Sequence, residues 1–259
     1  MKRKATGERF LLVAGILLII LIWTLLAFYL RQVKGRPFPY MWEAVMAIFS
    51  PSSGQENHIL LHTFHSLSRW LTGYGIAVVA GISLGFATAA SPRLATLLHP
   101  LIHTLQLIPG LAWVPIALIL FGLGNASAIF MIAVTAFAPI VINTRSGIRH
   151  IEPNLLRAAQ MMELGRIKTF SHIILPGAAP SIINGLRVAS ANGFRVLISA
   201  EMVLGSNLGL GYDLLQARWS FDYETAFGAV IIIVLIGLVV EKLIFSPIDD
   251  IISRKRGVA

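Results

Sequence analysis

An arginine near the middle of an otherwise apolar segment is the residue with the clearest potential for chemistry in this chain. Arg195 lies about midway along the segment from Ile182 to Leu204. If this segment crosses a membrane, a charge at that depth costs roughly 2.5 to 3.5 kcal/mol or more unless it faces a cavity or a partner. Guanidinium groups match planar oxyanions through two parallel hydrogen bonds. The sequence therefore predicts that Arg195 lines a pathway for an anion, with a purely structural pairing as the alternative.

Three polar residues accompany Arg195 on the same segment. Asn192 and Ser199 lie three residues before it and four after it, so on a helix they share its face. They either add hydrogen bonds to the predicted pathway or bond only to neighbouring helices. Glu201, near the end of the segment, is on a different face. We expect Glu201 to belong to the pathway or to hold the loop that follows.

Three histidines have a spacing that suits a metal. His58, His62 and His65 recur at i, i+4 and i+7, which places them on one helix face and could hold zinc. No carboxylate or thiolate completes such a site. We therefore expect an interfacial helix over residues 58–70, entering the membrane at a slant, and no metal.

Enzymatic motifs are missing or lie in the wrong context. Residues 81–85 match GxSxG, but they belong to an apolar segment instead of a strand-to-helix turn, so Ser83 is expected to pack. The glycine-rich segment 205–211 carries no lysine, and the chain has neither a GxxxxGK[ST] phosphate loop nor an HExxH motif. Asp249 and Asp250 are adjacent and point different ways, which favours a solvated tail. Without cysteine there is no thiolate nucleophile and no disulfide. We expect no catalytic residue and no cofactor in this chain.

Long apolar segments must position these residues. Hydrophobic residues make up 56% of the chain and charged residues 13%, with a net charge of +9. This composition indicates a membrane protein. The basic residues gather between apolar segments and at the ends, which fits membrane orientation better than nucleic-acid binding. Six segments are predicted to span the membrane: Phe10 to Leu30, Leu71 to Ala90, Leu94 to about Phe121, Ala126 to Ile142, Ile182 to Leu204 and Thr225 to Phe245.

Several features refine this outline. The first span is too long for the apolar part of a signal peptide and lacks a cleavage site, so we expect a retained helix. A short helix is predicted around Met41 to Phe49 within a loop over 31–57, and a second loop over 205–224. Residues 81–85 also form a GxxxG pattern, which marks a close helix contact or occurs by chance. Pro109 and Pro115 interrupt the third span, where they either free carbonyls to face a pathway or only kink the helix.

A polar and basic island, Leu156 to Pro176, separates two of the spans. Its apolar stripe consists of Ala158, Met161, Met162, Leu164 and Ile167. Arg157, Arg166 and Lys168 keep the other side at water or lipid headgroups. Pro176 cannot donate the next backbone hydrogen bond, so we expect it to end a short amphipathic helix that lies outside the bilayer.

The distribution of basic residues predicts the orientation. An even number of spans puts both termini on one side of the membrane. That side also holds Arg93, the island, and Arg145 and Arg149, which precede the island in the sequence. Most of the lysine and arginine residues outside the spans therefore lie on this side. The positive-inside rule then places the termini and the island in the cytoplasm.

Two short motifs in this island resemble a known family. Arg157-Ala158-Ala159 followed by Ile174-Leu175-Pro176 resembles the cytoplasmic "EAA" loop of the inner-membrane permease subunits of bacterial ABC importers. Within that superfamily, the chain is most similar to the branch that serves nitrate, taurine and aliphatic sulfonates. Arg157 stands where the family motif has glutamate, and Glu163 where it usually has glycine, with Gly165 two residues later. The other matching pieces are residues 62–69, 109–115, 121–122, 142–144 with 147–149, and 200–202 followed by 209–212.

The resemblance implies an architecture and a set of partners. It implies an all-α, type I ABC importer permease fold with about six transmembrane helices and cytoplasmic termini, as a multi-pass protein of the bacterial inner membrane. Residues 1–57 would precede a permease core over 58–259, whose cytoplasmic coupling loop covers 143–178. The implied partners are a second permease copy, two cytoplasmic ATPase subunits that hold ATP and Mg, a periplasmic solute-binding protein and the lipid bilayer, but no nucleic acid. Contacts with the ATPase are expected from Arg157, Ala158, Ala159, Met162, Glu163, Gly165, Arg166, Lys168, Leu175 and Pro176.

The expected function is that of a transport subunit without enzymatic activity. It would move nitrate, a sulfonate, taurine or a similar organic anion, driven by ATP that the partner hydrolyses. The pathway would involve Arg195, Asn192, Ser199, Glu201, Pro109 and Pro115. A gradient-driven secondary transporter or channel without an ATPase is the alternative, and the long basic loop argues against it. A membrane-embedded enzyme would need a catalytic cluster that the sequence does not supply.

Overall fold

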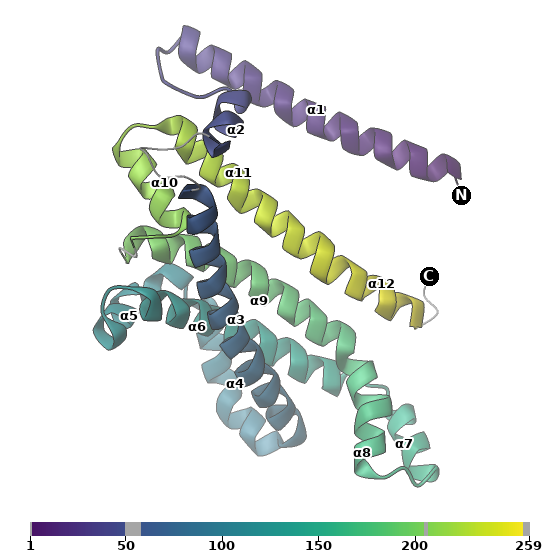
Figure 1. Cartoon of the computed structure of the whole chain (residues 1–259). Helices are drawn as coiled ribbons and strands as arrows, with labels where there is room; N and C mark the ends of the chain where they lie inside the picture. Colours follow the sequence, from purple (N-terminus) through teal and green to yellow (C-terminus); the bar gives the residue numbers. More distant parts are fainter. Residues whose placement is uncertain (1, 50–57, 205–206, 256–259) are drawn as a thin grey trace. The chain divides into compact units, whose positions relative to one another are not determined.

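The computed structural model describes residues 2–49, 58–204 and 207–255, and every regular element in these ranges is helical (Figure 1). Five helical segments are long and apolar enough to cross a membrane: Val13–Gln32, Ile59–Ala90, Asn125–Arg149, Arg166–Val203 and Tyr223–Ile252. A bent pair, Pro92–Leu107 with Gly110–Phe121, supplies a sixth if it counts as one span. The predictions of an all-α chain and of about six spans are confirmed.

Some predicted features fall outside this description. Residues 50–57 of the first predicted loop, Gly205 and Ser206 of the glycine-rich segment, and Arg256 at the basic C-terminus lie outside the described residues, as does the side chain of His58.

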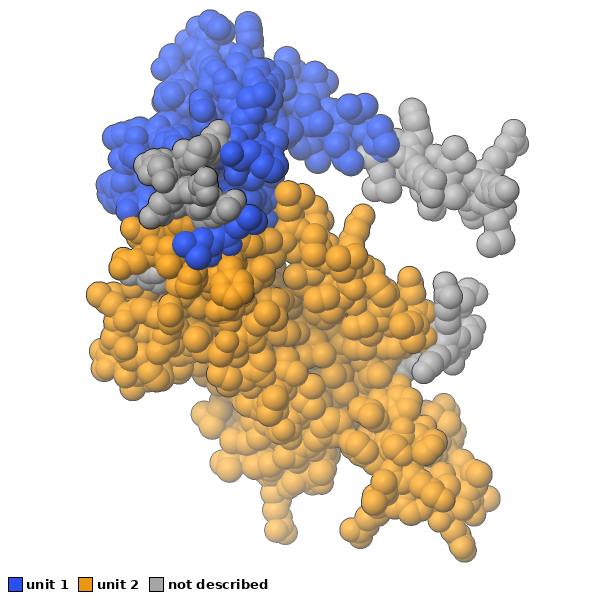
Figure 2. All heavy atoms as spheres, viewed as in Figure 1, with its two compact units in different colours: residues 1–61, 213–234 blue, residues 62–212, 235–259 orange. Residues whose placement is uncertain are grey.

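The described chain forms two compact units (Figure 2). The first comprises residues 1–61 and 213–234, and the second comprises residues 62–212 and 235–259. The first unit thus includes a late segment that the sequence analysis assigned to the permease core. The predicted boundary between residues 57 and 58 stays a prediction.

In the first unit, polar and aromatic contacts join α1 (Lys2–Gln32) to α2 (Met41–Phe49) and to the start of α11 (Tyr223–Val240). The Arg31 guanidinium donates to both carboxylate oxygens of Glu43, at 3.0 and 2.6 Å. The rings of Trp23, Phe38 and Phe227 form a cluster with centroids 4.9 to 5.7 Å apart. The short helix predicted around Met41 to Phe49 is confirmed.

In the second unit, α6 (Asn125–Arg149) and α9 (Leu175–Val203) lie side by side and make the most extensive helix contact (Figure 1). Glycines allow this close approach. A Cβ atom on Gly185 would lie 2.6 Å from the Cβ of Asn143, and one on Gly147 would lie 2.7 Å from the Cβ of Ser181. Since neither position has room for a side chain, the two backbones pack directly against each other.

The helix α3 (His58–Ala90) packs on α6 through the predicted GxxxG pattern. A Cβ atom on Gly81 would lie 2.9 Å from the Cβ of Ile140, and one on Gly85 would lie 2.5 Å from the Cβ of Thr144. Ser83 is exposed on another face, so the expectation that it packs is wrong within the described chain. The close contact is therefore real, and the match to GxSxG has no strand-to-helix turn around it.

The structure corrects the predicted start of this span. Residues 58–90 form one continuous helix, so a separate interfacial helix over 58–70 is wrong. Residues 58–72 contain no proline or glycine that would end a helix before Gly73. The polar residues His62, Ser66 and Arg69 of this segment are buried and do not lie at an interface with water.

The predicted proline interruption is confirmed at Pro109 and wrong at Pro115. The helix α4 (Pro92–Leu107) is followed by a short 3-10 turn, Gly110–Trp113, and by α5 (Val114–Phe121), with a bend of 106° between the two parts. Pro109 sits at the bend, whereas Pro115 lies in the first turn of α5, where a missing N–H costs nothing. A Cβ atom on Gly110 would lie 2.1 Å from the Cγ2 of Val196, so the bend packs directly on α9.

The island does not form one short helix: it contains the short helix α7 (Pro153–Met161) and the first turns of a longer helix that begins with α8 (Arg166–Thr169). The helix α7 is followed by a turn, then by α8, and a π-helical turn, Phe170–Ile174, joins α8 to α9. The prediction that Pro176 ends a short helix is wrong, because the helix runs continuously from Arg166 to Val203. The wider π-helical turn just before Pro176 accommodates a residue that lacks an N–H and whose ring would crowd the preceding turn.

Two further corrections concern the C-terminal part. The predicted loop over 205–224 contains the helix α10 (Leu210–Trp219). The last span continues through a π-helical turn, Glu241–Phe245, into α12 (Ser246–Lys255). Arg187 of α9 forms ion pairs with Glu241, at 3.3 Å, and with Asp249. A solvated tail is therefore wrong for Asp249, while Asp250 is exposed.

The contact between α3 and α6 predicts opposite effects for two glycines of one helix. Gly85→Ala should lower stability by about 1–3 kcal/mol, because the added methyl group overlaps Thr144. Gly75→Ala is the matched control, since nothing lies within 4 Å of its Cβ position and alanine favours the helix. Thermal unfolding of the purified chain in mild detergent measures both. Equal midpoints for the two variants would contradict the close contact.

Candidate functional site

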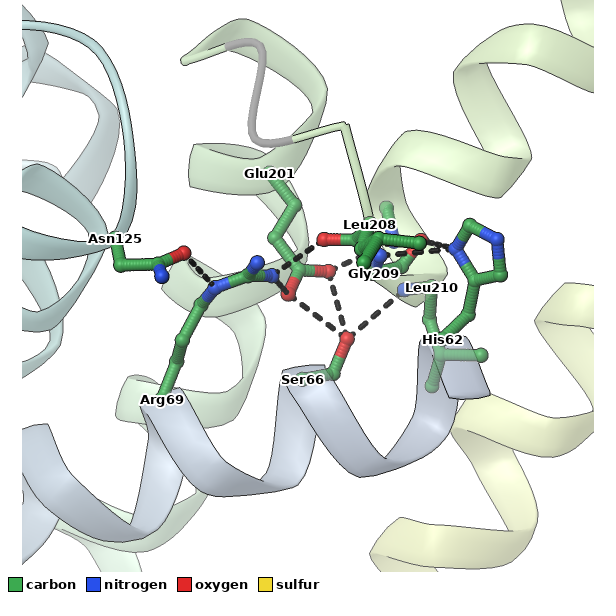
Figure 3. Close-up of polar contacts among 9 residues, drawn as sticks. His62, Ser66, Arg69, Asn125, Glu201, Leu208, Gly209 and Leu210 are labelled. Carbon is green, nitrogen blue, oxygen red and sulfur yellow. Dashed lines mark hydrogen bonds and ion pairs between the residues drawn. The ribbon is translucent and has the colours of Figure 1, made fainter. Parts of the chain in front are cut away.

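A buried ion pair joins the end of α9 to α3 (Figure 3). Arg69 Nη1 donates to Glu201 Oε1 at 2.6 Å and to the Leu208 carbonyl oxygen at 2.6 Å. The Ser66 hydroxyl donates to the same carboxylate at 2.8 Å, and Arg69 Nε donates to Asn125 Oδ1 of α6 at 2.7 Å. Only 4% of the Arg69 side chain and none of the Glu201 side chain is exposed. Further hydrogen bonds therefore surround the two buried charges.

The same network caps the first turn of α10. The Gly209 N–H donates to His62 Nδ1 at 2.9 Å, the Leu210 N–H to Ser66 Oγ at 2.8 Å, and the Gly211 N–H to Glu201 Oε2 at 2.9 Å (Figure 3). The first N–H groups of a helix have no partner within the helix and favour a negative charge nearby. These contacts explain why a helix forms where the sequence predicted a loop.

Gly209 is required at this point by conformation and by space. Its φ angle is +140°, and a Cβ atom there would lie 2.4 Å from the carboxylate carbon of Glu201. Any other residue would strain the backbone and displace the carboxylate. The sequence pieces 62–69, 200–202 and 209–212, which contribute to the family resemblance, thus meet in one contact.

Sequence reasoning did not identify Arg69 as a site residue and gave Glu201 two possible roles. The contacts match the second role of Glu201, since its carboxylate binds the segment that follows α9. A usable signal was present in the sequence: Arg69 and Glu201 are opposite charges close to the ends of two apolar segments. This signal could be interpreted only with the knowledge that the two segments contact each other in the fold.

The histidines that were predicted to share one helix face have different surroundings in the structure. His62 is buried and engaged with the Gly209 backbone, and His65 is half-buried. Within the described ranges, no group of three or more His, Cys, Asp or Glu residues has the geometry to hold a metal ion.

Arg195 is exposed on α9 and lines a hollow of about 210 Å³. Within the part of the chain that the structure describes, its guanidinium makes no hydrogen bond and no ion pair. The hollow is also lined by apolar or small residues, namely Trp70, Ser190, Ala191, Phe194, Ile236, Gly237, Val240 and Phe245, and by the ion pair of Arg187 and Glu241. The unpaired guanidinium of Arg195 thus faces a recess that is mostly apolar but also contains a paired arginine and carboxylate.

The other predicted pathway residues do not line this hollow. The Ser199 hydroxyl donates to the Arg195 carbonyl oxygen of its own helix at 3.1 Å. Asn192 is half-buried, and Pro109 and Pro115 are exposed on the bent pair. The bend does reach α9 at Val196, the residue next to Arg195. Their assignment to a pathway stays a prediction.

The predicted coupling residues cluster on α7, α8 and the start of α9. Nine of the ten are exposed. The tenth, Ala159, lies on the buried face of α7, with 2% of its surface exposed. Three large apolar side chains stand out beside them: Met161 (86% exposed), Met162 (71%) and Ile167 (84%). Arg157 on α7 and Arg166 and Lys168 on α8 are also exposed.

Glu163 holds the turn between α7 and α8 in a conformation that favours glycine. Its φ angle is +52°, and it follows the last turn of α7. The Leu164 N–H donates to the Ala159 carbonyl oxygen at 3.0 Å, as expected when a left-handed residue ends a helix. The departure from the glycine usual in the family therefore leaves the turn in place.

These features define a multi-pass helical membrane protein with a two-helix segment between its spans. Residues 77–255 match the family described as the binding-protein-dependent transport system inner membrane component, and the chain belongs to this family.

Curated relatives and a solved structure agree with this family. The bicarbonate transport system permease protein CmpB of Synechococcus elongatus is 33% identical, with 78% of this chain and 73% of that protein covered. The nitrate import permease protein NrtB of Leptolyngbya laminosa is 32% identical (78% and 72% covered), and the taurine transport system permease protein TauC of Escherichia coli is 29% identical (85% and 80%). A chain of the inward-facing MetNI methionine ABC transporter has a TM-score of 0.65 at 16% identity, covering 80% of this chain and 99% of that chain.

Family and fold together establish the class of protein. The chain has the type I ABC importer permease fold and is a transport subunit, not an enzyme, with ATP hydrolysis in a separate subunit. Permeases of this type work with ATPase subunits and a solute-binding protein, typically as dimers. A gradient-driven transporter or channel without an ATPase is not favoured.

The buried ion pair predicts a strong loss of stability when one partner is removed. Glu201→Leu should cost about 3–5 kcal/mol, because it leaves Arg69 buried without its carboxylate and the Gly211 N–H without an acceptor. The double variant with Arg69→Met should lose less than the two single losses combined. Unfolding in mixed detergent micelles measures all three variants. Strictly additive losses would contradict the pairing.

Proposed function

We propose that this chain is the permease of an ATP-driven importer for a small oxyanion, such as nitrate, bicarbonate, taurine or another sulfonate. The observation that carries the proposal is the exposed, unpaired guanidinium of Arg195 between α9 and α11. The names of the relatives support the same chemistry, since bicarbonate, nitrate and taurine each present a charged oxygen group. A guanidinium in an apolar recess attracts such a group more strongly than it would in water.

The coupling to ATP is proposed for the α7 and α8 segment. Met161, Met162 and Ile167 offer an apolar surface that a partner groove would cover, and Arg157, Arg166 and Lys168 offer polar contacts around it. The helix from Arg166 to Val203 is continuous. A displacement of α8 by the partner would therefore move the same helix that carries Arg195.

The proposed assembly has two permease copies, two ATPase subunits that hold ATP and Mg, and a periplasmic solute-binding protein, without nucleic acid. The permease would lie in the bacterial inner membrane with both termini and the α7 and α8 segment in the cytoplasm, as the basic residues indicate. ATP can drive transport only through its different affinity for two states of the assembly. Closure of the ATPase pair would favour the outward-open state, and hydrolysis would release it.

Removal of the Arg195 charge should reduce transport without removing the protein. Arg195→Gln should lower uptake of the anion about tenfold or more, because charge-assisted hydrogen bonds to it are lost. Uptake of labelled nitrate, bicarbonate and taurine by membrane vesicles holding the complete importer measures this, normalised to the amount of permease. The matched control is Arg93→Gln, because Arg93 is exposed on α4 and does not line this hollow, so uptake should be unchanged. Normal uptake by Arg195→Gln would contradict the proposed anion pathway.

Charges placed on the apolar surface should separate the permease from its ATPase. The double variant Met161→Asp with Ile167→Asp should insert and fold normally, because both side chains are more than 80% exposed. It should retain at most about a tenth of the ATPase on affinity purification, since burying carboxylates in an apolar groove is unfavourable. Asn154→Asp, an exposed residue at the start of α7, is the control and should retain the ATPase. Full retention by the double variant would place docking elsewhere.

A further inference from the structure

A second cavity, of about 380 Å³, opens between α4 and the C-terminal half of α6. Its basic lining comes from His99 and His103 of α4, and from Arg145, Arg149 and His150 at the end of α6. Apolar walls are supplied by Ala95, Ile102, Val141 and Ile142, and none of the lining residues within the described ranges is a carboxylate. None of these residues belongs to the hollow that Arg195 lines.

The positive groups of this cavity have no counter-charge within the described chain. Arg145 Nε is buried and makes no hydrogen bond, and Arg145 forms no ion pair in the described ranges. The arginines Arg31, Arg69 and Arg187, by contrast, are each paired with a carboxylate. Arg145 and Arg149 are four residues apart on one helix, a spacing at which like charges repel.

The histidines supply further hydrogen-bonding groups at this cavity. The rings of His99 and His103 have centroids 4.2 Å apart, and both side chains are exposed. A second hollow, of about 370 Å³, shares His99, Arg145 and Arg149, and none of the described residues that line it is a carboxylate. The half-buried Arg145 and the exposed Arg149 beside it therefore carry uncompensated positive charge, which favours a bound anion.

We propose that this cavity is an oxyanion-binding site, occupied by a free anion or by the phosphate of an anionic lipid. Arg145 and Arg149 would bind the oxygens, and the Ser146 hydroxyl and the histidines would complete the ring of donors. The apolar walls suit a small anion with few hydrogen-bonding groups as well as the glycerol end of a lipid, and basic pockets between membrane helices bind lipid headgroups. The site does not depend on the transport role of Arg195.

Its position gives such a site a structural consequence. Arg149 is the last residue of α6, and α7 begins four residues later at Pro153. A bound anion would neutralise the end of α6 directly before the exposed α7 and α8 segment. The occupied cavity would therefore stabilise the helix end from which that segment departs.

The test measures binding by the purified full chain, without transport. In one arm, the delipidated protein in mild detergent is titrated with inorganic phosphate and with nitrate by isothermal calorimetry. In the other arm, it is titrated with phosphatidylglycerol in mixed micelles, with uncharged phosphatidylcholine as the reference. Binding in the first arm assigns the site to a free anion, and binding confined to the second assigns it to a lipid phosphate.

Variants decide whether binding belongs to this cavity. Arg145→Gln and Arg149→Gln should each weaken binding about tenfold or more, since each removes charge-assisted hydrogen bonds. Arg93→Gln is the matched control, because Arg93 is exposed on α4 and lines neither hollow, so binding should be unchanged. If Arg145→Gln fails to fold, the exposed Arg149 still provides the test. No binding in either arm, or an equal loss in Arg93→Gln, would overturn the proposal.

Discussion

The buried pair of Arg69 and Glu201 is the interaction that holds α3, the end of α9 and the start of α10 together. A buried ion pair stabilises a fold only when further hydrogen bonds offset the loss of hydration. Here, Ser66, Asn125, the Leu208 carbonyl and the Gly211 N–H supply those bonds. Because the Ser66 hydroxyl and the Glu201 carboxylate also accept the N–H groups of Leu210 and Gly211, the carboxylate of one helix fixes the start of the next. Residues more than a hundred positions apart in the chain are thus held in one polar contact.

The helix α9 links this contact to the exposed α7 and α8 segment. One end of α9 carries Glu201, and the other end continues through the π-helical turn at Phe170–Ile174 into α8. Along its length, glycines bring it against α6 and against the bend at Gly110. A side chain at these positions would push the backbones apart. Motion of α8 would therefore be transmitted along a helix that is packed tightly on one side and carries Arg195 on another.

Features that depend on local pattern could be predicted from the sequence. Apolar length predicted the spans, the GxxxG pattern predicted the contact of Gly81 and Gly85 with α6, and apolar residues between turn signals predicted the helix at Met41–Phe49. Features that depend on distant partners could not. The helix at Leu210–Trp219 needs hydrogen-bond acceptors from α3 and α9 for its first N–H groups. The continuity across Pro176 needs a π-helical turn that no periodicity reveals.

The arginines divide according to whether a carboxylate meets them. Arg31, Arg69 and Arg187 are paired, and each joins two elements of the fold. Arg195 and Arg145 have no such partner in the described chain, although each lies beside a recess between helices. A chain with a low content of acidic residues cannot neutralise every arginine internally, and a charge that is left between apolar helices is unfavourable unless something external binds it. The two recesses lie on different helix pairs, so an anion bound in one leaves the other free. Under the two proposals, the permease would therefore hold a carried anion in one recess and, in the other, a separate anion that stabilises the helices next to the proposed coupling segment.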